Sequence, residues 1–186
     1  MITHSKAQLK GWTEKRLYDK DGKPKAMFRW NALGTLLNRL FSIDVRIPFI
    51  TGYSSLNPII QNLVTTVGKA IVAGQTNGVT TAPVTAIAVG TGTGAAAAGD
   101  TALGTEITDS GLGRGAATTS RVTTTTTNDT AQWVKSFTVT GTKAVTEEGL
   151  LDNNTSGGNL LARQVFSAIN VVNGDTLQIT HKLAVS

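Results

Sequence analysis

Residues 144–186 read AVTEEGLLDNNTSGGNLLARQVFSAINVVNGDTLQITHKLAVS, and this stretch carries the clearest strand and turn patterns of the chain. From Leu177 to Val185 the residues alternate between two sets, which places one set on a buried face of a strand and the other in water. From Leu160 to Val172 both sets are largely apolar, as in a strand that is covered on both faces. Gly157-Gly158 and Asn173-Gly174-Asp175 favour turns. The stretch predicts a β-meander that needs further strands to complete a core.

Composition limits the class of protein. The chain has 186 residues, of which 40% are hydrophobic and 16% charged, and its mean hydropathy is zero. Its apolar runs fall well short of the roughly 20 residues that cross a bilayer, so we expect no membrane partner. The first ten residues lack the apolar run of a secretory signal, which favours synthesis and assembly in a cytosol. The sequence has no cysteine, which excludes disulfides, and its 20 glycines are typical of a β-rich protein with many loops.

Positive charge is concentrated at the N-terminus. Residues 1–46 hold ten basic and four acidic residues, a balance of +6, whereas residues 47–186 hold seven basic and eight acidic residues, a balance of −1. A basic segment on a near-neutral body favours an acidic partner surface.

Residues 8–30 predict a β-hairpin whose turn is Asp19-Lys20-Asp21-Gly22. An isolated hairpin is marginal in water, so this one must pack on its own body or on a neighbour. We expect it to form an arm that binds a partner through its aromatic and basic residues: Trp12, Lys15, Arg16, Lys23, Lys25, Phe28, Arg29 and Trp30. Stacking on nucleic-acid bases is the alternative use of these side chains, and we favour a protein partner.

Two helices are expected in the first half of the chain. Asn31 is a candidate cap for a short helix over residues 32–41, and residues 43–47 alternate as a strand does. A longer helix is expected from Pro58 to Ala73, because Asn57 suits its N-cap, Gly74 suits its end and apolar residues recur at helical spacing.

Further strands are expected after residue 84. The first begins at Thr85 and runs into glycine, and Gly-rich loops follow at Gly90–Asp100 and Thr108–Ala117. A Thr-rich strand is expected at Arg121–Thr127, because branched threonines fit a pleated surface. Another is expected at Ala131–Thr140, with one side formed by Trp133, Lys135, Phe137 and Val139. The predicted fold is mainly β. Residues 84–186 are expected to form an antiparallel β-sandwich or jelly-roll-like domain. Residues 57–83 are expected to form a packed helix and a link, and residues 1–56 an extended basic N-terminal arm with a hairpin and a short helix.

Several short motifs occur in a fixed order: AVGTGTG at 88–94, AAGDTALGTE at 97–106, TEEGLLD at 146–152, GGNLLAR at 157–163 and FSAINVVNGDTLQIT at 166–180. Together they resemble a recurrent module of structural proteins in tailed bacteriophages, which are described as tail, fibre or minor virion proteins. The resemblance covers roughly residues 84–186 and leaves the basic hairpin without a role. It implies a virion protein that is assembled in the host cytoplasm.

We considered four candidate sites, and each has a plainer explanation. Gly90, Gly92 and Gly94 suggest a phosphate-binding loop, but no Gly-Lys-Ser/Thr follows. The turn at 19–22 resembles part of a calcium loop but lacks its first and last ligands. The acidic group Glu147, Glu148 and Asp152 could be a pair of catalytic carboxylates, and is better explained as an exposed turn before a strand. His181 is expected at the surface or at the core edge, and two histidines without cysteine are poor metal ligands.

The sequence therefore predicts no enzyme and no cofactor. We expect a structural virion component that forms symmetric copies and contacts major capsid or tail proteins, either as capsid decoration or near the tail. The alternative is a receptor- or glycan-binding fibre module that uses its Gly-rich loops.

Overall fold

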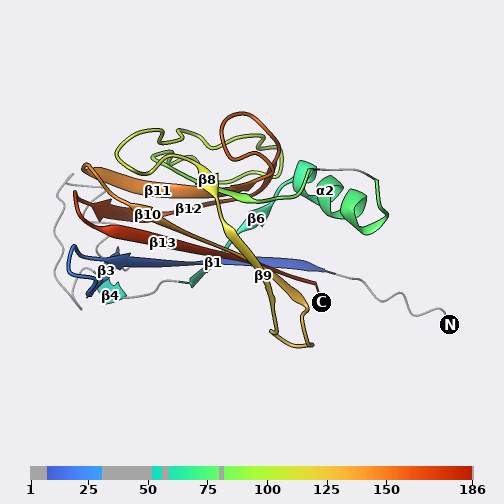
Figure 1. The fold of residues 1–186 in the computed structure, drawn as a ribbon, viewed down its shortest axis with the longest axis horizontal. Coiled ribbons are helices and arrows are strands. Elements are labelled where there is room, and N and C mark those ends of the chain that lie inside the picture. The colour runs from blue at the N-terminus through green and yellow to red at the C-terminus, as the bar shows by residue number, and fades with distance from the viewer. Residues whose placement is uncertain (1–7, 31–51, 56–58, 80–81, 186) are drawn as a thin grey trace.

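The computed structural model describes residues 8–30, 52–55, 59–79 and 82–185. This part of the chain is mainly β: two antiparallel sheets face each other, and one helix lies at the end of the pair (Figure 1). The predicted β-sandwich with one packed helix is confirmed. The predicted short helix at 32–41 and strand at 43–47 lie outside the described residues.

The first sheet, called sheet 1, joins the two ends of the described chain. Its order is β2 (Pro24–Lys25), β1 (Leu9–Tyr18), β13 (Thr176–Val185), β10 (Thr130–Thr138) and β9 (Thr118–Val122). β5 (Ile59–Gln61) also pairs with β1. The β1–β13 ladder is continuous from Leu9 opposite Val185 to Tyr18 opposite Thr176. Two neighbouring strands of this sheet therefore come from opposite ends of the sequence.

The second sheet, called sheet 2, lies over the first. Its order is β6 (Leu63–Val64), β12 (Leu160–Val171), β11 (Lys143–Leu151), β7 (Ala86–Gly90) and β8 (Gly115–Ala116). A separate pair is formed by β3 (Met27–Trp30) and β4 (Gly52–Ser55). The chain passes from sheet 2 to sheet 1 between β8 and β9 and again between β12 and β13. The C-terminal strands were expected to form one meander, and this expectation is wrong because β12 and β13 lie in different sheets.

The core fills the space between the sheets. β13 contributes Leu177, Ile179 and Leu183, as its alternation predicts, and β10 contributes Trp133 and Phe137. The predicted shared side of this strand faces the core: Trp133 and Phe137 are buried, and Lys135 Nζ lies 4.6 Å from the centre of the Phe137 ring. Val139, which follows the last residue of β10, is buried as well.

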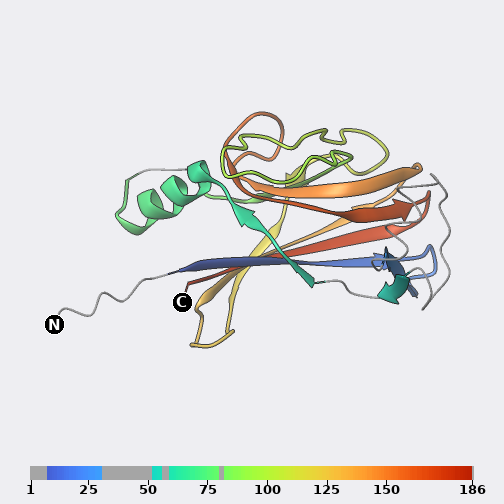
Figure 2. The same cartoon turned by 180° about the vertical axis from the view of Figure 1, so that it is seen from behind.

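A second, smaller core covers the outer face of sheet 2. Ala86, Ala88, Leu151 and Leu160 pack there against Leu103, which belongs to the long segment between β7 and β8. Figures 1 and 2 show this segment lying on the side of sheet 2 that faces away from sheet 1. β12 is consequently covered on both faces, as its sequence predicts.

The basic hairpin does not protrude. Its turn forms as predicted, with the Asp19 carboxylate accepting hydrogen bonds from the amides of Asp21 and Lys23. β1, however, lies inside sheet 1 between β13 on one edge and β2 with β5 on the other. Residues 9–25 are therefore part of the sandwich, because the inward residues of β1 complete its core.

The long helix begins eight residues later than expected. α2 spans Thr66–Thr76, and Thr65 is its N-cap, with a side chain that accepts a hydrogen bond from the amide of Gly68. The preceding residues form β5 and β6, which pair with β1 and β12. Pairing to existing strands therefore overrides the helical spacing of the apolar residues. Asn57 and Pro58 lie outside the described residues.

The threonine run also differs from its prediction. β9 ends at Val122, and residues 123–129 form the turn into β10. The Asp129 carboxylate accepts hydrogen bonds from the amides of Thr124, Thr125 and Thr126. These bonds, first that of Thr126, hold the pKa of Asp129 well below its usual range. A capped turn replaces the predicted strand because Asp129 satisfies three amides that a strand would pair elsewhere.

Candidate functional site

Glu147 and Glu148 are consecutive residues of β11, and both are fully buried. They were expected in an exposed turn, and this expectation is wrong. Successive side chains of a strand point to opposite faces. Glu147 meets the long segment on the outer face of sheet 2, and Glu148 meets Thr13 and His181 between the sheets. The two carboxylates therefore cannot act on one substrate as an acid–base pair.

Backbone amides surround the Glu147 carboxylate. Its Oε1 accepts from the amides of Thr105 at 2.7 Å and Gly92 at 2.9 Å, and its Oε2 accepts from the amide of Gly104 at 3.0 Å. Burial would raise the pKa of Glu147, but these amides and the Arg163 guanidinium hold it below its ordinary value. The carboxylate thus fixes both ends of the 92–105 loop to the sheet.

Arg163 extends this arrangement from the neighbouring strand β12. Its Nη2 lies 2.7 Å from Glu147 Oε2, and its Nη1 donates to Asp100 Oδ2 at 2.8 Å. Arg163 Nη2 also donates to the carbonyl of Gly94. We call Glu147, Arg163 and Asp100 the loop clamp. The sequence contained both Arg163 and Asp100 in its motifs, but no spacing rule linked them to Glu147, because the contacts are made across strands.

The glycines of AVGTGTG leave room for the clamp. A Cβ at Gly90 would overlap Glu147 Oε1 and the carbonyl of Thr105, and a Cβ at Gly92 would overlap the same carboxylate. The Gly-rich loop does surround an anion with amides, but that anion is the protein's own side chain. The amides of Gly92, Gly104 and Thr105 are therefore not available for a phosphate.

A second polar group lies on the inner face, and we call it the core polar cluster. It comprises Thr13, Lys15, Asn62, Glu148, Gln164 and His181. Glu148 Oε1 accepts from the Thr13 hydroxyl at 2.8 Å, and Glu148 Oε2 lies 3.2 Å from His181 Nδ1. Since an ionised carboxylate only accepts, Nδ1 carries the proton, and Nε2 is the ring atom beside the Asn62 amide. His181 was expected at the surface or core edge, and it is instead completely buried.

Lys15 supplies the positive charge of this cluster. Its Nζ donates to Gln164 Oε1 at 2.8 Å and lies 4.6 Å from the centre of the Phe166 ring. Burial would raise the pKa of Glu148, but His181, Lys15 and the Thr13 hydroxyl hold it below its ordinary value. Every titratable member of the cluster is sealed from solvent, so the cluster has no access for a substrate.

The predicted partner-binding residues fall into three groups. Lys15 is fully buried, so it cannot contact a partner, and Lys25 is paired with Asp175 at 2.8 Å. Arg16 and Lys23 are exposed, and Trp12 is half-buried on the outer face of sheet 1. The backbones of Phe28, Arg29 and Trp30 belong to β3, which pairs with β4 in a separate two-stranded sheet. The structure therefore does not gather the eight residues into one site.

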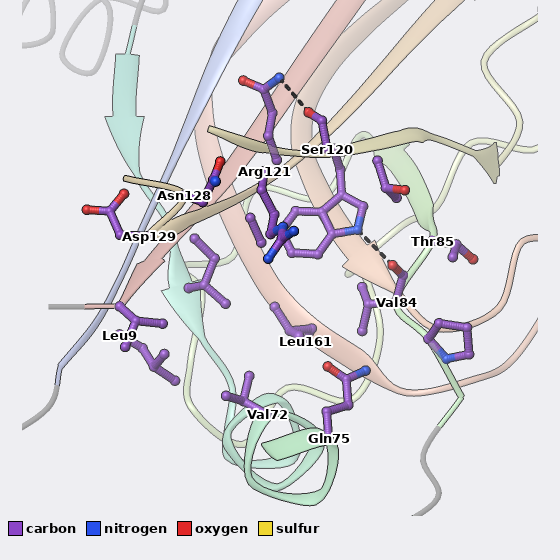
Figure 3. A pocket seen from close by; sticks show the side chains of 17 residues that line it. Leu9, Val72, Gln75, Val84, Thr85, Ser120, Arg121, Asn128, Asp129 and Leu161 are labelled. Atoms are coloured by element: carbon purple, nitrogen blue, oxygen red, sulfur yellow. Dashed lines mark hydrogen bonds between the residues drawn. The ribbon is translucent and has the colours of Figure 1, made fainter. Parts of the chain in front are cut away.

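An open pocket of about 770 Å³ lies at one end of the sandwich. We call it the end pocket. Val72 and Gln75 of α2 and Arg121 of β9 lie on opposite sides of it, with Leu161 in its wall (Figure 3). The Trp133 indole N–H donates to the carbonyl of Val84 at 2.7 Å and so fixes the ring beside this space. No sequence pattern pointed to the pocket, because its lining comes from several distant segments.

Within the described ranges, no three histidine, cysteine, aspartate or glutamate side chains gather as they would around a metal ion. Among the helical residues that the structure describes, no segment has the length and apolar character needed to span a bilayer. No protein-family model, no curated protein and no solved structure matches this chain.

Proposed function

We propose that this chain is a structural component of a tailed-bacteriophage particle, present in symmetric copies as a capsid decoration protein or a tail-associated protein. One observation supports the proposal: four of the five motifs that carry the resemblance to phage structural proteins meet at one buried site, where they fix the 92–105 loop to sheet 2. AVGTGTG, AAGDTALGTE, TEEGLLD and GGNLLAR meet in the loop clamp. These contacts hold the loop rigidly against the sheet, and a rigid surface suits a protein that packs against neighbours in a particle.

The proposed anchor is the exposed basic surface at the β1–β2 end of sheet 1. Arg16, Lys20 and Lys23 are exposed there, and Trp12 lies on the same outer face as Arg16. Arg16 lies 3.6 Å from Glu14 and Lys20 lies 2.8 Å from Asp21, which leaves Lys23 as the cation of this group with no ion pair among the described residues. The sequence predicts a protruding arm as the anchor. Because β1 lies within sheet 1 and Lys15 points into the core, the proposed anchor is instead the exposed surface of this strand and its turn. An acidic face of a capsid or tail protein is complementary to it.

The experiment is to purify particles, identify this chain by mass spectrometry and measure its copy number by gel densitometry. Hundreds of copies would assign it to capsid decoration, and about three to twelve would assign it to a tail or a fibre. Absence from purified particles would overturn the proposal. A low copy number together with binding to host cells would favour the receptor-binding alternative, in which the loops Gly90–Asp100 and Thr108–Ala117 are the presented surface.

The anchor is tested by charge reversal in the same particles. Arg16→Glu combined with Lys23→Glu is expected to lower incorporation severalfold, because it opposes like charges across the interface. Lys69→Glu, which reverses an exposed charge on α2, is the matched control. Equal incorporation of both variants would remove this surface from the proposal.

A further inference from the structure

The two sheets end in strands of very different character. Sheet 2 ends in β6 and β8, and each has two residues. On the side of β1 away from β13, sheet 1 ends in β2 and β5, which have two and three residues. β9, at the opposite end of sheet 1, has five. It is the longest of the strands that end a sheet among the described residues, and residues 164–171 of β12 also extend beyond the two-residue pairing with β6.

Short length and unsuitable residues protect most sheet edges from pairing with other chains. β2 has both features, since it consists of Pro24 and Lys25 and follows Lys23. β9 has neither. It reads TTSRV, contains no proline or acidic residue, and its first four residues are exposed. β-Branched residues at three of its five positions favour an extended strand.

β9 also lies beside exposed apolar surface. Thr119, Ser120 and Arg121 line the end pocket together with Trp133 and Leu161. Within the described part of the chain, no ion pair is found for Arg121. Among the described residues, only β10 pairs with β9, so a strand added along the other edge of β9 would extend the wall of this pocket. Backbone pairing and apolar burial would then occur together.

We propose that two copies of this chain pair through β9, antiparallel about a two-fold axis at Ser120, to form one continuous sheet. The sequence TTSRV is compatible with itself in this register. Ser120 faces Ser120 of the second copy, Thr119 faces Arg121 and Thr118 faces Val122, so no like charges lie directly opposite each other, and the two Arg121 residues are diagonal neighbours. A two-fold contact uses the same patch on both copies and closes after one pairing. The inference rests on the proposed assembly of this chain as symmetric copies, and it names the surface through which they meet.

The absence of cysteine from the sequence permits a sharp test with the full chain. Ser120→Cys would place two thiols directly opposite each other, about 4.5 to 5.5 Å apart between Cα atoms, which is within disulfide range. Thr118→Cys is the matched control, since it has a similar exposed position on the same face. In the proposed pair the Cα atoms of the two copies at position 118 would lie about 13 Å apart, so thiols introduced there could not bond to each other.

The expected result is a disulfide-linked dimer for Ser120→Cys under mild oxidation, with little for Thr118→Cys, measured on non-reducing gels and by intact mass. Combining Thr118→Cys with Val122→Cys is expected to restore cross-linking, because residues 118 and 122 face each other. Ser120→Glu is expected to raise the dimer dissociation constant about tenfold or more in sedimentation velocity, since two carboxylates would oppose each other. Ser120→Thr is expected to keep the dimer.

A chain that remains monomeric in sedimentation, or that cross-links equally well in the Thr118→Cys and Ser120→Cys variants, would overturn the two-fold pairing. Because these measurements use purified protein, a monomer that is nonetheless found in particles would reject the pairing and leave the proposed function standing. A chain that dimerises but is missing from particles would do the reverse.

Discussion

At the scale of single residues, Glu147 and Glu148 are two solutions to the burial of a carboxylate. Transfer of an isolated charge into a protein interior is very costly unless partners replace the lost water. Glu147 obtains three backbone amides and an arginine, and Glu148 obtains a hydroxyl, an imidazole and the charge of Lys15. The first arrangement fixes a loop to a sheet, and the second joins the two sheets across the core. Charged residues that looked like candidate catalysts therefore have structural roles.

The loop clamp predicts a difference between two glycines of the same motif. Gly90→Ala is expected to lower the free energy of unfolding by about 1 to 3 kcal/mol, because its Cβ overlaps both Glu147 and a backbone carbonyl that cannot move away. Gly94→Ala has no atom within 4 Å of its Cβ and is expected to change stability little. Urea unfolding of both variants measures the difference. Equal stability of the two would show that the clamp tolerates displacement.

The buried glutamates predict a direction for the pH dependence of stability. Their pKa values are lower in the folded protein than the ordinary value near 4.5. Folding therefore favours the ionised carboxylates, and this contribution is present above pH ~4.5 and is lost as the pH falls through the lowered pKa values. Wild-type unfolding free energy, measured by urea titration, is expected to fall steeply below pH ~4.5.

Glu148→Gln isolates one of these contributions. It is expected to cost about 3 to 5 kcal/mol at pH 7, because it removes the buried carboxylate that interacts with Lys15 and His181. Its stability is also expected to change less than that of the wild type on acidification. Glu14→Gln is the control, since Glu14 pairs with Lys182 and Arg16 on the outer face. A variant as acid-sensitive as the wild type would contradict the role given to Glu148.

At the scale of elements, local patterns predicted the strands whose own residues alternate or are apolar on both faces. β10 and β13 alternate as expected, β12 is covered on both faces, and the Asp19–Gly22 turn forms. The patterns failed where a distant segment decides the outcome. The apolar residues before Thr65 have helical spacing, yet β5 is drawn into pairing with β1. The sequence predicts Glu147 and Glu148 in an exposed turn, and this prediction is wrong because the loop and the Arg163 side chain that cover Glu147 come from other segments.

The observed start of α2 predicts the effect of removing its cap. The Thr65 hydroxyl accepts from the Gly68 amide at 2.8 Å and donates to the carbonyl of Leu160. Thr65→Ala removes both bonds and is expected to lower the free energy of unfolding by about 1 to 2 kcal/mol. The exposed neighbour Thr66 serves as control, and Thr66→Ala is expected to have little effect. Comparable losses in the two variants, measured by chemical denaturation, would argue against Thr65 as the helix start.

At the scale of the whole molecule, the sequence divided the chain at residue 84, whereas both sheets of the sandwich use strands from before that residue. β1 supplies Thr13, Lys15 and Leu17 to the core, and β6 pairs with β12. The sequence suggests a boundary at residue 84 because the basic residues concentrate before it and the motifs lie after it. Neither charge nor motif position indicates which strands pair. The most distant pairing, between Leu9 and Val185, leaves no local trace in the sequence.

This arrangement predicts that residues 84–186 do not fold alone. Without β1, one edge of β13 loses its ten-residue partner, and Glu148 loses the Thr13 hydroxyl and the Lys15 charge that offset its burial. We expect the 84–186 fragment to lack cooperative thermal unfolding and to show little dispersion of amide signals in NMR spectra. A chain that lacks only residues 1–7 keeps every described strand and is expected to unfold cooperatively, like the full chain. Cooperative unfolding of the 84–186 fragment would show instead that the motif-bearing segment is an independent domain, and that the N-terminal strands are an addition to it.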